Sequence, residues 1–260
     1  MRIHRIFGVL LRYMYNFRRS YDSLTDAFYW PLLDLLLWGL TSTYIQQSSG
    51  DKNIVLILIS GIVFWIIFWR AQYEITIGFL YELWNKNLVN LFVSPLKFSE
   101  WVTAWILMGI MKGALSFLFA CLLALLMYKL NLFSYGFSMI PFALTLLMSG
   151  WWIGFFVAGI LMRFGVKIQT IAWSVPWIFA PFSAIYYPIS VLPDWAQYIS
   201  RALPMSYVFE GMREVTTTGH LNWNSVAIAF GLNIFYLILS IIFMKTGFNK
   251  VLKMGVTKIY

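Results

Sequence analysis

Six long runs of apolar residues divide the chain, and short stretches that are polar or contain proline separate them. An α-helix needs about 20 mainly apolar residues to cross a bilayer. On this basis the pattern predicts crossing helices over residues 24–45, 54–69, 101–127, 139–162, 168–187 and 226–244. The chain is therefore predicted to be an all-α integral membrane protein, with six transmembrane helices in a single transmembrane domain over residues 1–260.

The first part of the chain, residues 1–20, carries a different pattern. Its apolar residues fall on one helical face, and Arg5, Arg12 and Arg19 recur at seven-residue spacing on another. An apolar stripe opposite arginines is typical of a helix that lies in the membrane interface, with its cations near anionic headgroups. We therefore expect an N-terminal interfacial helix in contact with membrane lipids.

A less apolar segment, residues 74–94, follows the second predicted crossing. Within it, residues 80–92 place their leucines on one helical face, whereas Glu82 and Asn85 lie largely away from that face. The helix is expected to end before Pro95, because proline cannot continue it. This pattern predicts a short amphipathic helix at the membrane surface. A helix that rests on lipid and a helix that binds another protein show the same stripe.

Composition agrees with a membrane protein, and the distribution of charge sets its orientation. Of the 260 residues, 61% are hydrophobic and only 11% are charged, which lies outside the range of soluble domains. The net charge of +9 does not by itself indicate a nucleic-acid partner.

Six crossings place both termini on one side of the membrane, and most basic residues fall on that side. They are Arg2, Arg5, Arg12, Arg18, Arg19, Arg70, Lys86, Lys97, Arg163, Lys167, Lys245, Lys250, Lys253 and Lys258. The other side holds only Lys52, Lys129, Arg201 and Arg213. By the positive-inside rule, both termini are cytoplasmic. We expect a multi-pass protein of the cytoplasmic (inner) membrane of a prokaryote.

Prolines interrupt the chain at and after the fifth apolar run. The outer signature consists of Tyr187, Pro188, Leu192, Pro193 and Pro204, followed by Glu210 and Arg213 one helical turn apart. Proline cannot donate a backbone hydrogen bond, so this segment cannot cross a bilayer as one smooth helix. The charge distribution puts it on the outer side. We expect residues 188–224 to form an outer helical hairpin, re-entrant or at the surface.

The order and spacing of these prolines, with the final Glu-x-x-Arg, resemble the signature of type-2 ABC transporter membrane subunits, the ABC-2-type permeases. The resemblance extends over nearly the whole chain and implies the permease subunit of an ATP-driven ABC exporter. It also implies a homodimer of this chain that works with two ABC ATPase subunits. The implied substrate is an amphiphile that moves outward: a lipid, a glycolipid or polysaccharide, or a drug-like compound.

The same resemblance implies a role for residues 74–94. In the family this position holds the cytoplasmic coupling helix, which docks on the partner ATPase. The residues that match this role are Leu80, Tyr81, Glu82, Trp84, Asn85 and Leu88.

Two ionisable residues lie inside apolar runs, Asp34 in the first and Lys112 in the third. Such residues are costly in the membrane and usually face protein or a water-filled cavity. They either line a polar path or form a structural ion pair, and the sequence does not show whether they meet. An alternative function is a proton-coupled secondary transporter, in which Asp34, Lys112 and Glu210 would act as relay groups.

Several kinds of chemistry have no motif in the chain. There is no Gly-Lys dipeptide, so the phosphate-binding loop of ATPases is absent, and ATP with its Mg²⁺ is expected on the partner subunit. No His-Glu-x-x-His pair or cysteine cluster is present, and the one cysteine, Cys121, lies in an apolar run. We therefore expect no metal site, no cofactor bound by this chain and no enzymatic activity.

Overall fold

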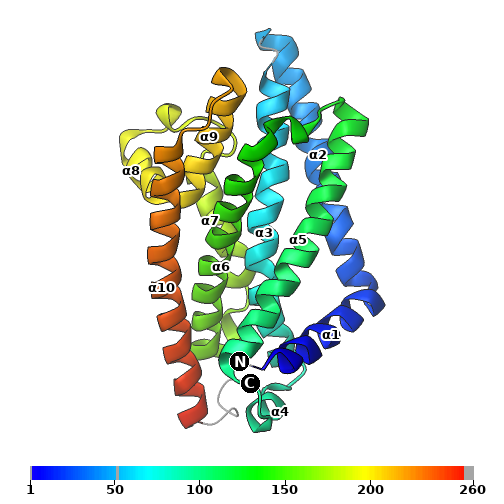
Figure 1. Ribbon diagram of the computed structural model, residues 1–260, viewed down its shortest axis with the longest axis vertical. Helices are drawn as coiled ribbons and strands as arrows, with labels where there is room; N and C mark the ends of the chain where they lie inside the picture. Colours follow the sequence, from blue (N-terminus) through cyan, green and yellow to red (C-terminus); the bar gives the residue numbers. More distant parts are fainter. Residues whose placement is uncertain (1, 51–52, 255–260) are drawn as a thin grey trace.

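The computed structural model describes residues 2–50 and 53–254, and every regular element within them is a helix (Figure 1). The all-α class is therefore confirmed. The side chain of Phe92 and those of residues 252–254 lie outside the description. The predicted charge distribution also used three lysines whose side chains lie outside the described part of the chain: Lys52, Lys253 and Lys258.

Ten α-helices make up the described chain. They are α1 (Ile3–Arg19), α2 (Tyr21–Ser49), α3 (Ile54–Trp84), α4 (Leu88–Val93), α5 (Phe98–Tyr128), α6 (Met139–Phe164), α7 (Ile171–Phe179), α8 (Asp194–Ala202), α9 (Pro204–Thr218) and α10 (Trp223–Met254). Short 3₁₀ turns lie at Leu132–Ser138, Gly165–Ile168, Ala180–Phe182 and Ile189–Val191. Among the described residues, four helical segments are long and apolar enough to cross a membrane: α3, α5, α6 with its flanking turns, and α10.

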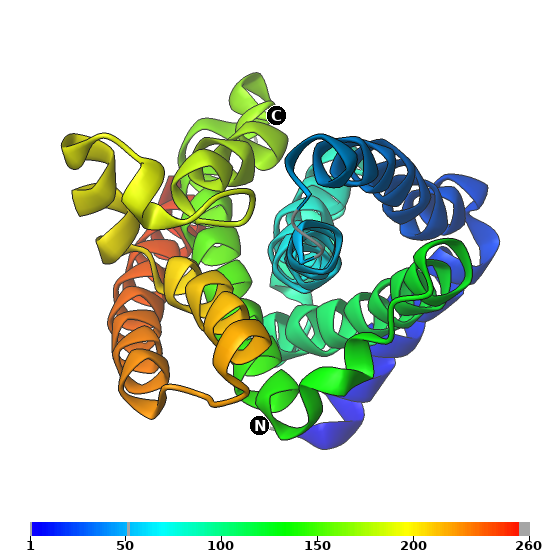
Figure 2. The same cartoon turned by 90° about the horizontal axis from the view of Figure 1, so that it is seen from above.

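Helix α3 occupies the centre of the bundle (Figure 2). It packs against α2 and α5 on one side and against α6 on the other, and α10 covers the outer face of α6. Glycines allow the closest of these approaches: a Cβ on Gly150 would lie 2.5 Å from the carbonyl oxygen of Phe68, and one on Gly154 would lie 3.0 Å from the Cβ of Ile75. Gly150 and Gly154 form the small-xxx-small pattern that such helix pairs use.

The predicted end of the second crossing, at residue 69, is wrong. The helix that begins at Ile54, α3, continues to Trp84. The continuation carries Arg70 and Glu74, whose charges suggested that the apolar run had ended. Arg70 is buried, and its Nη1 lies 2.6 Å from Asp26 Oδ2 on α2. Glu74 Oε2 lies 2.7 Å from Lys112 Nζ on α5. Each charge thus has a partner inside the bundle, and Arg70 is not the loop residue that the charge distribution assumed.

The predicted amphipathic helix over residues 80–92 is also wrong as a single element. Helix α3 ends at Trp84 and α4 begins at Leu88, and Lys86 between them adopts a left-handed φ of 52°. The backbone N–H of Asn87 donates to the carbonyl of Glu82 at 2.9 Å, which closes a tight turn. We call this turn with its two flanking helix ends the α3–α4 corner, residues 80–93.

The fifth predicted helix, residues 168–187, is shorter than expected. Helix α7 and the 3₁₀ turn after it form one apolar segment over Ile171–Phe182, below the length of the four candidate spans. Pro176 lies inside α7 and Pro181 inside the turn. Figure 1 places α8 and α9 at the end of the bundle opposite α1 and α4.

Candidate functional site

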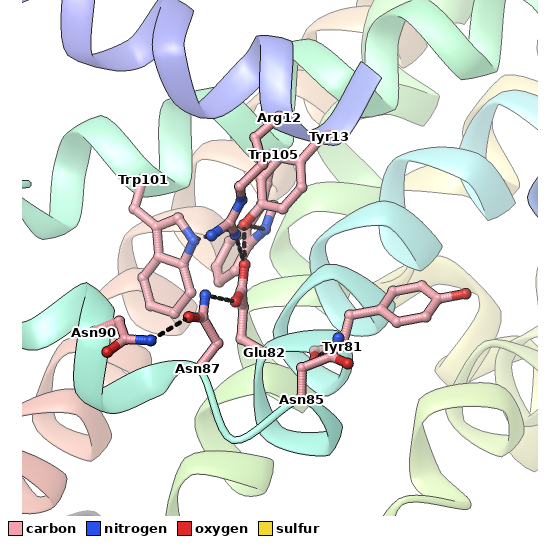
Figure 3. Close-up of polar contacts among 9 residues, drawn as sticks. All are labelled: Arg12, Tyr13, Tyr81, Glu82, Asn85, Asn87, Asn90, Trp101 and Trp105. Carbon is pink, nitrogen blue, oxygen red and sulfur yellow. Dashed lines mark hydrogen bonds and ion pairs between the residues drawn. The ribbon is translucent and has the colours of Figure 1, made fainter. Parts of the chain in front are cut away.

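The α3–α4 corner is organised around the carboxylate of Glu82, on the last turn of α3 (Figure 3). Its Oε1 pairs with the guanidinium of Arg12 on α1 and accepts a hydrogen bond of 2.8 Å from the hydroxyl of Tyr13. Its Oε2 accepts a hydrogen bond of 2.6 Å from Asn87 Nδ2. Glu82 is only 4% exposed, so the expectation that it lies on a solvent-facing polar side of a helix is wrong. A buried carboxylate must be paired, and these three donors satisfy that requirement.

The hydroxyl of Tyr13 connects this carboxylate to α5. It donates to Glu82 and accepts from the indole N–H groups of Trp101 at 2.9 Å and Trp105 at 3.1 Å. Burial raises the pKa of the Tyr13 phenol, so the hydroxyl keeps the proton that it donates. We call Arg12, Tyr13, Glu82, Asn87, Trp101 and Trp105 the Glu82 cluster. Through it, α1, the end of α3, the corner turn and α5 share one connected set of hydrogen bonds.

A second contact ties α1 to the start of α5. Glu100 accepts hydrogen bonds from the backbone N–H groups of Arg2 at 2.7 Å and Lys97 at 3.0 Å. Arg5 Nη1 lies 3.8 Å from its Oε2, and Arg5 also donates to the carbonyl of Pro95 after α4. Helix α1 is therefore attached to the rest of the protein at its beginning and near its middle.

The outward face of the corner carries a different set of side chains. Tyr81, Trp84 and Val89 are 45%, 40% and 49% exposed, and Asn85 and Lys86 are exposed beside them. In contrast, Leu80 and Leu88 are fully buried. The six residues expected to contact an ATPase thus divide in two: Tyr81, Trp84 and Asn85 reach the surface, whereas Leu80, Glu82 and Leu88 hold the corner from behind.

Comparison with protein families identifies the chain. A family model described as the ABC-2 type transporter matches residues 8–217, which is most of the sequence. The chain belongs to the ABC-2 type transporter family. It is accordingly a membrane permease subunit of an ABC transporter. None of the curated proteins matches the chain.

In this ABC-2 type subunit, the Glu-x-x-Arg of the outer signature binds the loop between α7 and α8. Arg213 donates to the carbonyl of Ala184, and Glu210 Oε1 accepts a 2.6 Å hydrogen bond from the N–H of Ile189. The two side chains lie 3.6 Å apart as an ion pair. Ala184 has a φ of +60°, which a non-glycine residue rarely adopts. The pair therefore fixes an unusual loop conformation against α9.

The other residues of the outer signature shape the same loop. The hydroxyl of Tyr187 donates to the carbonyl of Pro181 at 2.8 Å, and the carbonyl of Leu192 accepts from Gln197 Nε2 at 2.8 Å. The prolines begin helical segments: Pro188 precedes the turn at Ile189–Val191, Pro193 precedes α8, and Pro204 is the first residue of α9. Proline suits these positions, because the first helical N–H groups need no intrahelical acceptor.

The structure does not bring the possible polar-path residues together. Lys112 pairs with Glu74, and its Nζ also lies 4.7 Å from the centre of the Phe17 ring. Asp34 lies one turn before Trp38, whose ring stacks on Tyr186 at 4.5 Å. Lys112 is thus a member of a structural ion pair, which was one of the two interpretations of the sequence, and its partner is not Asp34.

Sequence reasoning missed most of the Glu82 cluster. Arg12 stood out only as one of three regularly spaced arginines, and Tyr13, Asn87, Trp101 and Trp105 carried no signal. Arg12 and Tyr13 lie 70 and 69 positions from Glu82 in sequence, whereas Asn87 lies only five positions away and reaches it through the tight turn at Lys86. No local pattern reports such contacts. Among the described residues, no group of three or more histidine, cysteine, aspartate or glutamate side chains is placed to hold a metal ion.

We predict that Glu82→Arg destabilises the protein by about 3–5 kcal/mol, because it removes the partner of Arg12 and places a second cation in the buried position of Glu82. The exchange Arg12→Glu with Glu82→Arg should recover part of this loss, since it restores opposite charges. Free energies of unfolding, measured by SDS titration of the purified protein in detergent, check both results.

Lys86→Glu is the control for this experiment. It also reverses a charge at the corner, but on an exposed side chain, so we expect a change within about 0.5 kcal/mol. If Glu82→Arg were no more damaging than Lys86→Glu, the Glu82 cluster would not hold the corner.

Proposed function

We propose that this ABC-2 type subunit is the membrane-spanning part of an ATP-driven exporter whose ATP is hydrolysed on separate ATPase subunits. The observation that carries the proposal is the two-sided construction of the α3–α4 corner. Its outer face is exposed and partly aromatic, and its inner face is fixed to α1 and α5 through Glu82. The sequence has no Gly-Lys of a phosphate-binding loop, which is consistent with hydrolysis on an ATPase partner.

The exposed face of the corner has the chemistry of a protein-binding surface. Tyr81 and Trp84 meet edge to face at 5.4 Å, and Trp84 Nε1 donates to Gln169 Oε1 at 2.9 Å, so both rings are held in place. Aromatic side chains are enriched at the centre of protein interfaces, where they bury a large area at a low entropy cost. Val89 on α4 extends this surface, and Lys86 and Asn85 border it.

The Glu82 cluster provides the route by which movement of the corner reaches the membrane. A push on α4 acts on Asn87 and Glu82, and through them on Arg12 and Tyr13 of α1. Tight, fully paired contacts transmit displacement because they cannot deform gradually. We therefore propose that the closing of the ATPases shifts α1 and the start of α5 together, and that this opens the path for substrate.

The topology that we propose has six crossings: α2, α3, α5, α6, α7 with its following turn, and α10. Helix α2 has 29 residues and spans about 44 Å, which exceeds the thickness of the hydrocarbon core. Its Asp26 is paired with Arg70, so that charge does not prevent burial. Figure 1 shows α1, α4 and the end of α10 at the same end of the bundle. The basic residues favour a cytoplasmic location for this end.

We predict that a membrane-impermeant thiol reagent labels single cysteines at Gln47 and His220 in intact cells, but not at Asn249. All three positions are exposed in the structure, so access depends only on the side of the membrane. The background carries a replacement of Cys121, which is buried. Labelling at Asn249 together with protection at His220 would reverse the orientation.

Exporter direction, an amphiphilic substrate and a homodimer complete the proposal. Two ATPases act as a pair in ABC transporters, so a single-chain permease of this size is most simply doubled by a second copy. No observation favours the proton-coupled alternative: Lys112 is engaged by Glu74, and Glu210 is engaged by Arg213.

We predict that Val89→Asp reduces the amount of ATPase that co-purifies with the tagged chain at least tenfold, because it places a charge in an apolar contact; tenfold corresponds to about 1.4 kcal/mol. ATP hydrolysis that vanadate inhibits, measured per mole of tagged chain, should fall in proportion. Val191→Asp is the matched control, because Val191 is likewise exposed but belongs to the outer loop.

Both variants should elute as the wild type does in size-exclusion chromatography, since neither side chain is buried. Equal ATPase recovery with Val89→Asp and Val191→Asp would contradict docking at the corner. A wild-type preparation without any ATP hydrolysis would contradict the proposed function as a whole.

A further inference from the structure

A cavity of about 770 Å³ lies between α1, the beginning of α2, the lower half of α3 and α5. Its volume falls within the range of small-molecule sites, roughly 300–1,000 Å³. The wall contains both acids and bases: Arg12, Arg19, Asp22, Asp26, Glu74, Glu82 and Lys112. Tyr73, Tyr81 and Trp105 add aromatic surface. A cavity with charges of both signs suits a ligand that itself carries both signs.

Most of these charges are already satisfied within the protein. Arg12 pairs with Glu82, Lys112 with Glu74, and Asp26 with Arg70 behind the wall. Two charged side chains differ from the rest. Among the described residues, neither Arg19 nor Asp22 forms an ion pair or a side-chain hydrogen bond, and both lie at the junction of α1 and α2. They are therefore the charges that remain available to a ligand.

The junction also offers a site for an anionic group. Helix α2 is 29 residues long, and its first backbone N–H groups face the region of Ser20 and Ser23, which line the cavity. The side chain of Ser20 caps the helix by accepting from the N–H of Ser23. The positive end of a helix dipole, serine hydroxyl groups and a free guanidinium are the elements that bind phosphate in proteins. Arg19 supplies the guanidinium.

The same cavity offers a site for a cationic group. Asp22, three positions after Arg19, carries a carboxylate without a partner among the described side chains, and Tyr73 and Tyr81 also line the wall. Carboxylates and aromatic ring faces are the two groups that bind ammonium ions. Glu74 in the same wall is only 7% exposed, and its Oε1 has no hydrogen-bond partner among the described residues. Glu74 is nevertheless paired with Lys112 through its Oε2, so Asp22 is the carboxylate in the wall that is left for a cationic group.

We propose that this cavity binds the head group of a zwitterionic phospholipid, with the phosphate at Arg19, Ser20 and Ser23 and the ammonium at Asp22. A lipid is favoured over a free zwitterion because α1 carries the apolar stripe of an interfacial helix, which places the α1–α2 junction at the level of the lipid headgroups. The proposal concerns binding alone, so it stands or falls independently of docking by an ATPase.

The test measures binding of short-chain phosphatidylethanolamine to the purified chain in detergent, by native mass spectrometry. Phosphatidylglycerol with the same acyl chains has the phosphate but no ammonium, and phosphoethanolamine has both groups but no acyl chains. We expect the wild type to bind phosphatidylethanolamine about tenfold more tightly than either. Arg19→Gln should weaken both lipids about tenfold, whereas Asp22→Asn should weaken phosphatidylethanolamine only and so remove the preference.

Arg18→Gln is the matched control. Arg18 is the neighbouring residue with the same charge and is exposed, but it is not part of the cavity wall, so its loss should leave both affinities unchanged. Arg19 and Asp22 are exposed as well, and their variants should elute as the wild type does. Equal binding of the two lipids by the wild type, or equal effects of Arg18→Gln and Arg19→Gln, would overturn the proposal. Phosphoethanolamine that binds as tightly as the lipid would overturn the assignment to a lipid.

Discussion

Charges inside an apolar bundle must be paired, and this constraint determines how the helices around α3 are arranged. Three charged residues on α3, at positions 70, 74 and 82, each find a partner on a different helix: Asp26 on α2, Lys112 on α5 and Arg12 on α1. An unpaired charge at any of these positions would cost several kcal/mol in a protein interior. The three pairs therefore fix which helix lies on which side of α3. Leucines at these positions would bury as much apolar surface as the three ion pairs do. The ion pairs instead make the order of the helices around α3 specific.

The two ends of the bundle apply the same chemistry to different tasks. At one end, Glu82 accepts from Arg12, Tyr13 and Asn87 and so joins α1 to the α3–α4 corner. At the other end, Glu210 and Arg213 bind the backbone of the loop between α7 and α8. Both arrangements use a carboxylate and a guanidinium to hold a segment that hydrophobic contacts alone would leave loose. The Glu82 cluster supports the corner that is proposed to bind the ATPase. The Glu210–Arg213 pair shapes the opposite end of the proposed substrate path.

Local pattern predicted the parts of this fold that depend on local physics. The apolar stripe of residues 1–20 became α1, and the prolines at 188, 193 and 204 each begin a helical segment as their chemistry requires. Prediction failed where a distant partner changes the meaning of a residue. Arg70 and Glu74 suggested the end of a crossing helix, yet both are buried, because Asp26 and Lys112 neutralise them across 44 and 38 positions of sequence. Glu82 likewise suggested a solvent-exposed helix face, yet it is buried, because Arg12 on α1 pairs with it.

If the Glu82 cluster couples the two segments, α1 and the α3–α4 corner move as one body. Pulsed electron paramagnetic resonance on the complex with its ATPase tests this directly, with spin labels at the exposed positions Tyr15 and Lys86 in a chain whose Cys121 is replaced. A second pair, at Lys86 and Val191, reports movement of the corner relative to the outer end. When ATP is trapped, we expect the distance from Lys86 to Val191 to change while that from Tyr15 to Lys86 stays constant. A change in the distance from Tyr15 to Lys86 would show that the corner moves without α1 and that the Glu82 cluster does not couple them.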